Sequence, residues 1–435
     1  MKLRQKKTCP LIPQCVVIDT NSTTSPPFTS GSSFTYDLVY HTIYGMNSDV
    51  IYLDYAATTP VDPAVLDAMM PYFGDQFGNA ASKNHIYGHN AEQAVRLGRS
   101  QIADLISCNP QEIVFTSGAT EANNLAIKGI AQKQSGDKNH IITCQTEHKS
   151  VLDSIETLRN QGFDITLLPV TPNGLISPNT LANAICAQTC LISIMMVNNE
   201  TGVIQPIATL GEIARNNGIC FHCDATQAIG KIKIAVNTLG IDLLSFSAHK
   251  IYGPKGIGAL WVNPKTKANK PIAQIDGGGH EVGIRSGTLN VPGIVAMGKA
   301  STLCLNHLAT ESKRIALLSA QLINRLTDAL DDVSINGADA PRVPHILNIS
   351  FNNTPSELVL LTLSNPKKKS VAIATGAACN TVIVQSSHVL EAMQCKEGVL
   401  NSALRFSIGR YTTEDDIKQA SNIIIETINK IRKNN

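Results

Sequence analysis

Short runs of apolar, often β-branched residues alternate with amphipathic helical patterns over residues 51–262, and this alternation limits the folds open to the chain. Strands separated by helices of about 10–15 residues imply crossover connections and a mainly parallel sheet. The runs are apolar on both faces, as a sheet covered by helices on both sides requires. We therefore predict an α/β fold with a mainly parallel seven-stranded sheet. The predicted strands are Glu112–Thr116, His140–Cys144, Ile165–Leu168, Leu191–Val197, Gly218–Cys223, Leu243–Ser247 and Gly258–Val262.

The pattern changes after Trp261. Residues Pro292–Leu330 predict two long helical stretches, and strand–helix alternation follows from His345 to the end. This indicates a second, smaller α+β domain. Within the first part, the predicted helices are Ala119–Gln134, Ser150–Gln161, Pro178–Ala187 and Ile207–Asn217.

The first 45 residues differ from the rest. Met1–Lys7 is basic, and Asn21–Ser33 is rich in Ser, Thr and Pro without hydrophobic periodicity, which is typical of a disordered tail. The segment lacks the apolar core of a secretory signal. Three interpretations stay open: Met46 is the true start, the segment is an organellar transit peptide, or it is an ordinary tail.

Composition excludes several classes of protein. The 435 residues carry 36 Lys+Arg against 34 Asp+Glu, so no basic surface of the kind that binds nucleic acid is expected. No apolar run approaches the roughly 18 residues of a membrane span. The 11 cysteines are spread over a long chain, which favours free thiols and a reducing compartment. We therefore predict a cytoplasmic enzyme or large binding protein that binds neither nucleic acid nor membrane.

The segment Thr116–Asn124 follows an apolar strand and opens a helix. Its small residues allow a ligand to approach the backbone, and a helix N-terminus offers free N–H groups to an anion. Thr120 adds a hydroxyl donor. The pattern predicts a phosphate site, although a plain strand-to-helix turn capped by Ser or Thr stays open as the alternative.

Asp224 directly follows a predicted strand and Lys250 follows the end of another, and ligands bind at such strand ends in open parallel sheets. A carboxylate there can pair with a cationic ring nitrogen, and a partly desolvated lysine can form a Schiff base with an aldehyde. Phosphate site, strand-end Asp and strand-end Lys together fit the needs of pyridoxal 5'-phosphate. A helix N-cap is the alternative for Asp224. The stretch Gly253–Gly258 lacks the Gly-Lys-Ser/Thr ending of a P-loop.

These motifs resemble those of cysteine desulfurases of the IscS/NifS type, in the class V aminotransferase family of fold type I pyridoxal-phosphate enzymes. The resemblance runs from about Ile51 to Thr413. The matching motifs are Tyr52–Pro60, Thr116–Glu121, Thr146–His148, Val197–Gly202, Asp224–Gln227, Ser247–Lys250, Gly277–His280 and Arg285–Thr288. On this resemblance, residues 60–308 would form the large cofactor-binding domain. Residues 46–59 and 309–435 would form the small domain with the mobile cysteine loop.

The resemblance implies a role for each catalytic residue. Lys250 would be the Schiff-base lysine and the base at the substrate Cα. Asp224 would hold the pyridine nitrogen protonated, and His148 would stack on the ring. Without the motif, a lone histidine such as His148 is more often an ordinary core or surface residue.

Further residues would bind the cofactor or the substrate. Gln227 would bond the ring hydroxyl, and Asn199 would lie near the ring and the substrate carboxylate. Thr288 would reach the phosphate of the other subunit, which implies a homodimer with shared active sites. The phosphate would otherwise be bound by Ala119, Thr120, Ser247 and His249.

Thr375–Thr381 resembles the loop that carries the persulfide-forming cysteine, here Cys379, and Ser387–Leu390 follows at the family's spacing. A thiolate there would attack the substrate's sulfur. A buried, inert thiol is the alternative. Arg405 would clamp the substrate α-carboxylate bidentately, with Arg410 as the second choice.

The chain departs from the family in three places. The loop reads Thr-Gly-Ala-Ala-Cys-Asn-Thr in place of Ser-Gly-Ser-Ala-Cys-Thr-Ser, and the segment after it is more apolar than usual. The chain also ends at Asn435, without the tail that housekeeping members use to dock a scaffold protein. We expect the loop's behaviour and its sulfur acceptor to differ accordingly.

The other cysteines are predicted to be packing residues. Cys220 and Cys223 form a C-x-x-C pattern, but in an extended strand they point to opposite faces, so no metal site is expected. Cys186 and Cys190 straddle a helix-to-strand change and are predicted core residues.

We therefore predict a cysteine desulfurase that converts L-cysteine to L-alanine and passes sulfur through Cys379 to an acceptor protein, for iron–sulfur clusters or thio-modification. A selenocysteine lyase or another class V enzyme is one alternative. A non-catalytic partner subunit that keeps the fold is another, although intact Lys250, Asp224, His148 and Cys379 argue against it.

Overall fold

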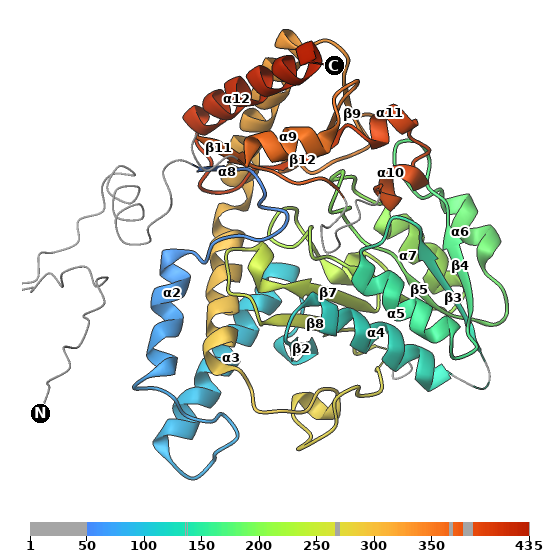
Figure 1. The fold of residues 1–435 in the computed structure, drawn as a ribbon. Coiled ribbons are helices and arrows are strands. Elements are labelled where there is room, and N and C mark those ends of the chain that lie inside the picture. Colours follow the sequence, from blue (N-terminus) through green and yellow to red (C-terminus); the bar gives the residue numbers. More distant parts are fainter. Residues whose placement is uncertain are drawn as a thin grey trace, which may run out of the picture. The chain divides into compact units, whose positions relative to one another are not determined.

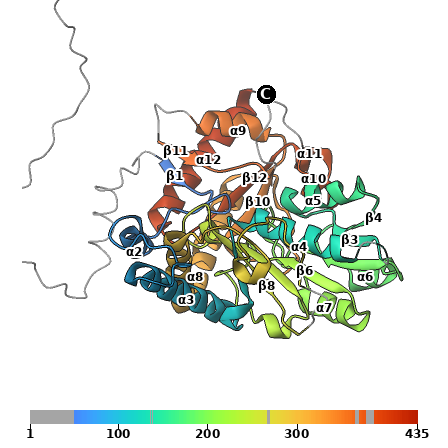
Figure 2. The same cartoon turned by 90° about the horizontal axis from the view of Figure 1, so that it is seen from below.

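The computed structural model describes residues 50–134, 136, 138–265, 270–364, 369–376 and 386–434. Within them, the central sheet has seven strands in the order β2-β8-β7-β6-β5-β3-β4 (Figures 1 and 2). β8 runs antiparallel to both neighbours and the other pairs are parallel, which confirms the predicted α/β fold. The strands are β2 (Ile113–Thr116), β3 (His140–Cys144), β4 (Asp164–Leu168), β5 (Thr189–Ser193), β6 (Cys220–Asp224), β7 (Leu243–Ser247) and β8 (Gly258–Val262).

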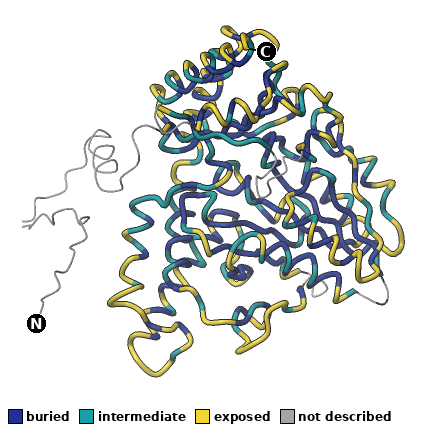
Figure 3. Tube along the Cα trace, in the orientation of Figure 1, coloured by how far each residue is buried: buried dark blue, intermediate teal, exposed yellow. Residues whose placement is uncertain are grey.

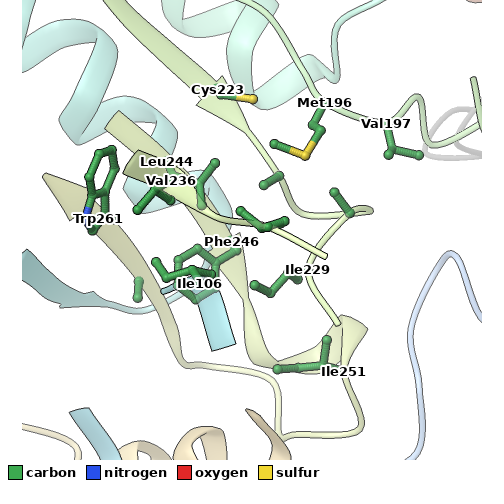
Figure 4. Packing of buried hydrophobic residues seen from close by; sticks show 14 of the residues in the cluster. Ile106, Met196, Val197, Cys223, Ile229, Val236, Leu244, Phe246, Ile251 and Trp261 are labelled. Carbon is green, nitrogen blue, oxygen red and sulfur yellow. The ribbon is translucent and has the colours of Figure 1, made fainter. Parts of the chain in front are cut away.

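Two apolar clusters cover the two faces of this sheet, so every strand except the edge strand β4 is buried along its length. One cluster holds the apolar faces of α4 (Ala119–Gln134) and α5 (Lys149–Arg159). Leu244, Phe246 and Trp261 belong to the other cluster and pack closely (Figure 4). Its helices include α3 (Ile86–Ile106), α6 (Pro178–Ala184) and α7 (Ile207–Asn216).

The predicted pair of helical stretches in 292–330 is wrong, because the structure has one 39-residue helix, α8 (Val291–Ala329). Its first half packs in the large-sheet cluster, up to Cys304, and its second half packs in a separate cluster from Ile315 onward. Residues 305–314 lie between these two cores and contribute no buried apolar side chain. The apolar periodicity therefore lapses there, although residues 305–314 contain no Gly or Pro.

The separate cluster forms the core of the C-terminal part (Figure 1). There β1 (Val50–Tyr52) pairs in parallel with β11 (Ser370–Ala372). β10 (Ile346–Phe351) pairs antiparallel with both β9 (Val333–Ile335) and β12 (Ala403–Ser407). The other helices of this part are α9 (Ser356–Leu363), α11 (Glu397–Leu400) and α12 (Glu414–Asn434). The helix α10 (His388–Ala392) instead packs its Val389 and Leu390 into the large-sheet cluster.

Short helical segments complete the chain. They are α2 (Pro63–Met69) and the 3-10 helices η1 (Met70–Phe73), η2 (Pro110–Glu112), η3 (Val236–Thr238), η4 (Ala248–Lys250) and η6 (Glu281–Gly283). No helix among the described residues is long and apolar enough to cross a membrane. The predicted tail, residues 1–45, lies outside the described residues.

Strand ends were predicted less well than strand positions. The run predicted as Leu191–Val197 stops being a strand at Ser193. Met196 and Val197 stay buried in the core beyond that end, so apolarity alone could not mark it (Figure 4). Buried chain is concentrated in the interior, and exposed chain lies mainly on the periphery (Figure 3). The prediction Gly218–Cys223 is likewise shifted, because β6 ends on Asp224 itself.

Candidate active site

Three strands end at one edge of the sheet. β2 and β7 are both antiparallel to β8, so Thr116 and Ser247 end their strands on the same side as Asp224 of β6. Helix α4 begins three residues after Thr116. A Cβ added at Gly118 would lie 3.8 Å from Ser247 Oγ, so the helix start and the end of β7 face each other across a narrow space.

Lys250 and Gln227 converge on one backbone oxygen. The Nζ of Lys250 donates to the carbonyl oxygens of Ala56 and Ala57, both at 2.7 Å. The Nε2 of Gln227 donates to the same Ala56 oxygen at 2.9 Å. Two strand ends and the segment after β1 therefore meet at this point.

The Lys250 amine is tuned toward neutrality. Burial and the nearby Arg405 cation lower its pKa to about 8, while Asp54 and Asp224 oppose them. A substantial fraction of this amine is therefore neutral near pH 7–8, the form that can attack an aldehyde.

Asp224 is buried and held from both oxygens. Its Oδ1 accepts from the Thr226 backbone N–H at 2.9 Å, and its Oδ2 accepts from Asn123 Nδ2 at 2.8 Å. The chain after Asp224 forms turns, so the helix N-cap alternative is wrong. The carboxylate keeps accepting capacity for a further donor, since each oxygen has two lone pairs.

His148 caps helix α5. Its Nδ1 accepts from the Ser150 backbone N–H at 3.1 Å and lies 2.9 Å from Ser150 Oγ. Because Nδ1 must keep its lone pair for this bond, the neutral ring carries its proton on Nε2. Desolvation lowers the pKa of His148, helped by Lys250 and His388 and opposed by Asp224 and Asp153.

Arg405 on β12 faces the same region. Its Nη2 pairs with Asp54 Oδ1 at 2.9 Å, and its Nη1 donates to the backbone oxygen of Asn199 at 3.0 Å. Its Nε is buried without a hydrogen-bond partner among the described residues. Arg410 is instead tied by ion pairs to Asp62 and Glu311, which leaves Arg405 as the better anion clamp.

Of the remaining predicted residues, four lie near these groups, whereas Thr288 and Cys379 are not placed there. Ala119 and Thr120 begin α4 beside Ser247, as the phosphate prediction requires. His249 sits next to Lys250, with Nδ1 3.2 Å from Thr58 Oγ1, and burial lowers its pKa to about 4. Thr288 is exposed, and within the described part of the chain no hydrogen bond joins it to the other candidates. Cys379 lies outside the described residues.

Comparison with known proteins agrees with this arrangement. The aminotransferase class-V family matches residues 51–420. A cysteine desulfurase IscS of Anaeromyxobacter sp. (strain Fw109-5) is 47% identical over 383 residues, which cover 88% of this chain and 93% of the relative.

The chain belongs to the cysteine desulfurase group of the class-V aminotransferase family. Enzymes of this family depend in general on pyridoxal phosphate.

Solved structures agree with this membership. A NifS-like protein matches with a TM-score of 0.80 and 33% identity, covering 87% of this chain and 99% of its own. A structure titled SspA in complex with cysteine matches with a TM-score of 0.74 and 39% identity, covering 83% and 99%.

Gly376 and Ser387, described residues on the two sides of positions 377–385, meet at one carboxyl group. On the N-terminal side, a Cβ added at Gly376 would meet Glu200 Oε2 at 2.0 Å. On the C-terminal side, Ser387 Oγ donates to the same Glu200 oxygen. Burial raises the pKa of Glu200, which Ser387, His388 and Arg405 oppose. Gly376 and Ser387, on the two sides of positions 377–385, therefore both contact the Glu200 side chain.

Sequence reasoning assigned no role to several residues that build this site. Asp54, Asn123 and Glu200 stand inside quoted motifs but received no role. Ser150 stands just after a motif, and Ala56 contributes through its backbone. Asp54, Asn123 and Glu200 could have been found from their positions inside motifs. Ala56 could not, because it acts through a backbone oxygen that every residue type has.

The cysteine predictions held in part. Cys220 and Cys223 lie in different apolar clusters, which confirms that they face opposite sides of the sheet. Cys190 is buried as predicted. The prediction for Cys186 is wrong, because this residue is exposed in the connection between α6 and β5.

Proposed function

We propose that the chain is a pyridoxal-phosphate-dependent cysteine desulfurase that converts L-cysteine to L-alanine. The sulfur would pass to Cys379 and then to an acceptor protein. The observation that carries the proposal is the convergence of Lys250 and Gln227 on the Ala56 oxygen, beside a buried Asp224. The names of the relatives and the cysteine bound to one of them support the substrate.

The residues present fit the phosphate and the ring nitrogen of the cofactor. The free N–H groups at the start of α4 and the Ser247 hydroxyl border the space that a side chain at Gly118 would enter, and an anion suits such a helix start. Asp224 is an anion with acceptor capacity left, as a partner of a protonated pyridine nitrogen must be. Gln227 would bond the ring hydroxyl.

The remaining groups fit the aldehyde and the substrate. Lys250, with its pKa near 8, would hold the aldehyde covalently. Arg405 would bind the substrate carboxylate through donors that include its unpartnered Nε, with Asn199 next to it. His249 and Thr288 are proposed phosphate contacts, Thr288 toward the second subunit.

The bound cofactor would supply an electron sink that labilises bonds at the substrate's Cα and Cβ. Lys250, once displaced by the substrate amine, would take the proton from Cα. Neutral His148 would stack on the ring and present its Nε2–H to the reacting groups. The ion pair with Asp54 would keep Arg405 in place while the carboxylate binds.

Cys379 would then act as nucleophile. Its thiolate forms an S–S bond to the substrate sulfur while the Cβ–S bond breaks, and the bond electrons stay with the carbon fragment, which gains protons and leaves as alanine. The product on the protein is a persulfide, which passes its outer sulfur to an acceptor protein thiol. Persulfide formation needs no external oxidant, because the carbon fragment takes the electrons.

The test is sulfur release from L-cysteine with a thiol acceptor, with alanine measured in parallel. We expect Cys379→Ala to abolish persulfide and sulfide, whereas Cys186→Ser, which changes an exposed cysteine, should leave both unchanged. Unchanged release by Cys379→Ala would show that the persulfide step is wrong. Alanine from selenocysteine and none from cysteine would favour the lyase, and a colourless protein after cofactor addition would favour a non-catalytic subunit.

We also propose a homodimer with shared active sites. An aromatic and aliphatic group lies exposed on the surface, with the rings of Phe77 and Tyr87 5.3 Å apart. Such exposure favours burial against a second copy. The exposed Thr288 would then reach across the interface. The exposed apolar residues of this stretch of the chain are Met70, Phe73, Phe77, Ile86 and Tyr87.

The domain division and location are proposals of the same kind. The switch of α8 between two cores after Cys304 supports a large domain over 60–308 and a small domain of 46–59 and 309–435. The described cysteines are all free, which supports a reducing, cytoplasmic location.

A further inference from the structure

Asn123 lies under the candidate site and makes two contacts with a single amino group. Its Nδ2 donates to Asp224 Oδ2 at 2.8 Å and to Ser150 Oγ at 2.8 Å. The side chain is fully buried in α4, between β6 and the start of α5. It therefore links the strand that carries Asp224 to the helix that His148 caps.

The orientation of this amide is fixed. Among the described residues nothing donates to Asn123 Oδ1, although this oxygen is buried. A flipped amide would turn that oxygen toward Asp224, whose ionised carboxylate has no proton to give. The protein thus leaves one buried acceptor unpaired and keeps both N–H groups on Asp224 and Ser150. Buried polar groups without a partner are rare and call for an explanation.

The contact with Ser150 sets the direction of the next hydrogen bond. Since Ser150 Oγ accepts from Asn123, its own hydrogen is free to point at His148 Nδ1, 2.9 Å away. The Ser150 backbone N–H also donates to that Nδ1. The hydrogen bonds therefore run in one direction along Ser150 to His148, and both bonds at Nδ1 require its lone pair.

We propose that Asn123 is a positioning residue that couples Asp224 to His148: it holds the carboxylate and, through Ser150, keeps the imidazole proton on Nε2. The meaning of this coupling rests on the proposed function, in which Asp224 and His148 act on the same cofactor ring. In the alternative arrangement, Ser150 Oγ would accept from a protonated Nδ1, which would favour the imidazolium form.

Several charged or titratable groups face His148 and bear on the test. They are Asp224 on β6, Lys250 on η4, His388 on α10 and Asp153 on α5 itself. Desolvation, Lys250 and His388 lower the pKa of His148, while the two carboxylates raise it. Removing the Asn123 amide changes none of these charges, so a shift in Asn123→Ala reports on the hydrogen bonds.

The experiment measures the His148 titration midpoint in the cofactor-free chain by hydrogen–deuterium exchange at the imidazole C2, read by mass spectrometry. We expect Asn123→Ala to raise this midpoint by about half a pH unit or more, because Ser150 Oγ becomes free to accept from Nδ1–H. In the Ser150→Ala background, the same substitution should give a smaller shift. The exposed His307 serves as an internal reference that should not move.

A matched control separates coupling from lost packing. Asn336 is also a buried asparagine whose Nδ2 donates to two side-chain oxygens, those of Asn348 and Ser350, in the other core. Asn336→Ala should lower the melting temperature without moving His148. If Asn123→Ala leaves the His148 midpoint unchanged while lowering the melting temperature, Asn123 is merely structural. If Asn123→Ala shifts the His148 midpoint equally in the unmodified chain and in the Ser150→Ala background, the coupling does not run through the Ser150 hydroxyl. Neither result depends on desulfurase activity.

Discussion

The Nζ atom of Lys250 lies 2.7 Å from the carbonyl oxygen of Ala56, a residue 194 positions earlier in the chain. The contact joins the segment after β1 to the segment after β7, and no sequence pattern around either residue predicts it. It gives the half-buried amine hydrogen-bond acceptors, since no carboxylate among the described residues forms an ion pair with it.

We expect Lys250 to react as an amine with a pKa near 8 in the cofactor-free chain, because burial and Arg405 disfavour its charged form. The pH dependence of its acylation, followed by mass spectrometry, should have a midpoint near 8. Since the unfolded chain would hold this proton up to about 10.5, the destabilising effect of burying it should fade as the pH rises from 8 to 10.5.

Arg405→Gln supplies the control for that measurement. It removes a cation that lowers the Lys250 pKa, so the acylation midpoint should move upward. A midpoint at the ordinary lysine value in the unmodified chain would contradict the described environment.

Arg405→Lys should raise the KM for cysteine by roughly 10- to 100-fold, because a planar donor set is replaced by a point charge. Its contacts with Asp54 and the Asn199 backbone would be lost as well. Arg410→Lys is the comparison, since Arg410 is engaged by Asp62 and Glu311. It should lower the melting temperature and leave KM unchanged; the reverse pattern would make Arg410 the carboxylate clamp.

Gly376→Ala should slow persulfide formation on Cys379, because the new Cβ would meet Glu200 Oε2 at 2.0 Å and displace the carboxyl that Ser387 bonds. Single-turnover mass spectrometry would measure the persulfide. Cofactor binding should stay intact, since the atoms nearest the added Cβ belong to Glu200 and Ser387 and not to Lys250 or Asp224. Gly398→Ala is the control, because nothing lies within 4 Å of its added Cβ. If persulfide forms on Cys379 at the same rate in both variants, the contact between Gly376 and Glu200 has no effect on this step.

Phe77→Asp should weaken the proposed homodimer, because a charge would be buried where an exposed aromatic ring now lies. Sedimentation velocity would report the mass: about twice 46.6 kDa for the unmodified chain and a larger monomer fraction for the variant. Leu317→Asp, at another exposed apolar position, is the comparison. If both variants sediment like the unmodified chain, the interface lies elsewhere.

Much of the fold was predictable because its determinants are local. Alternating strands and helices specify a parallel sheet, and strand-end Asp224 and Lys250 follow from it. The long helix α8 was not predicted as one element, since its apolar face lapses where it leaves one core for another. The exposure of Cys186 was not predicted, because a cysteine counts as apolar in a sequence pattern whether or not its side chain reaches solvent.

The sequence by itself determined the fold class and the family, and it predicted which groups react, because periodicity and motif spacing are properties of neighbouring residues. Only the tertiary structure decided how those groups are tuned. The shared Ala56 oxygen, the Asn123 amide between Asp224 and Ser150, and the Glu200 carboxyl at both flanks of the cysteine loop join residues far apart in the chain. Hydrogen bonds and burial act over a few ångströms of space, so they exist only once the strands have paired and the two cores have packed.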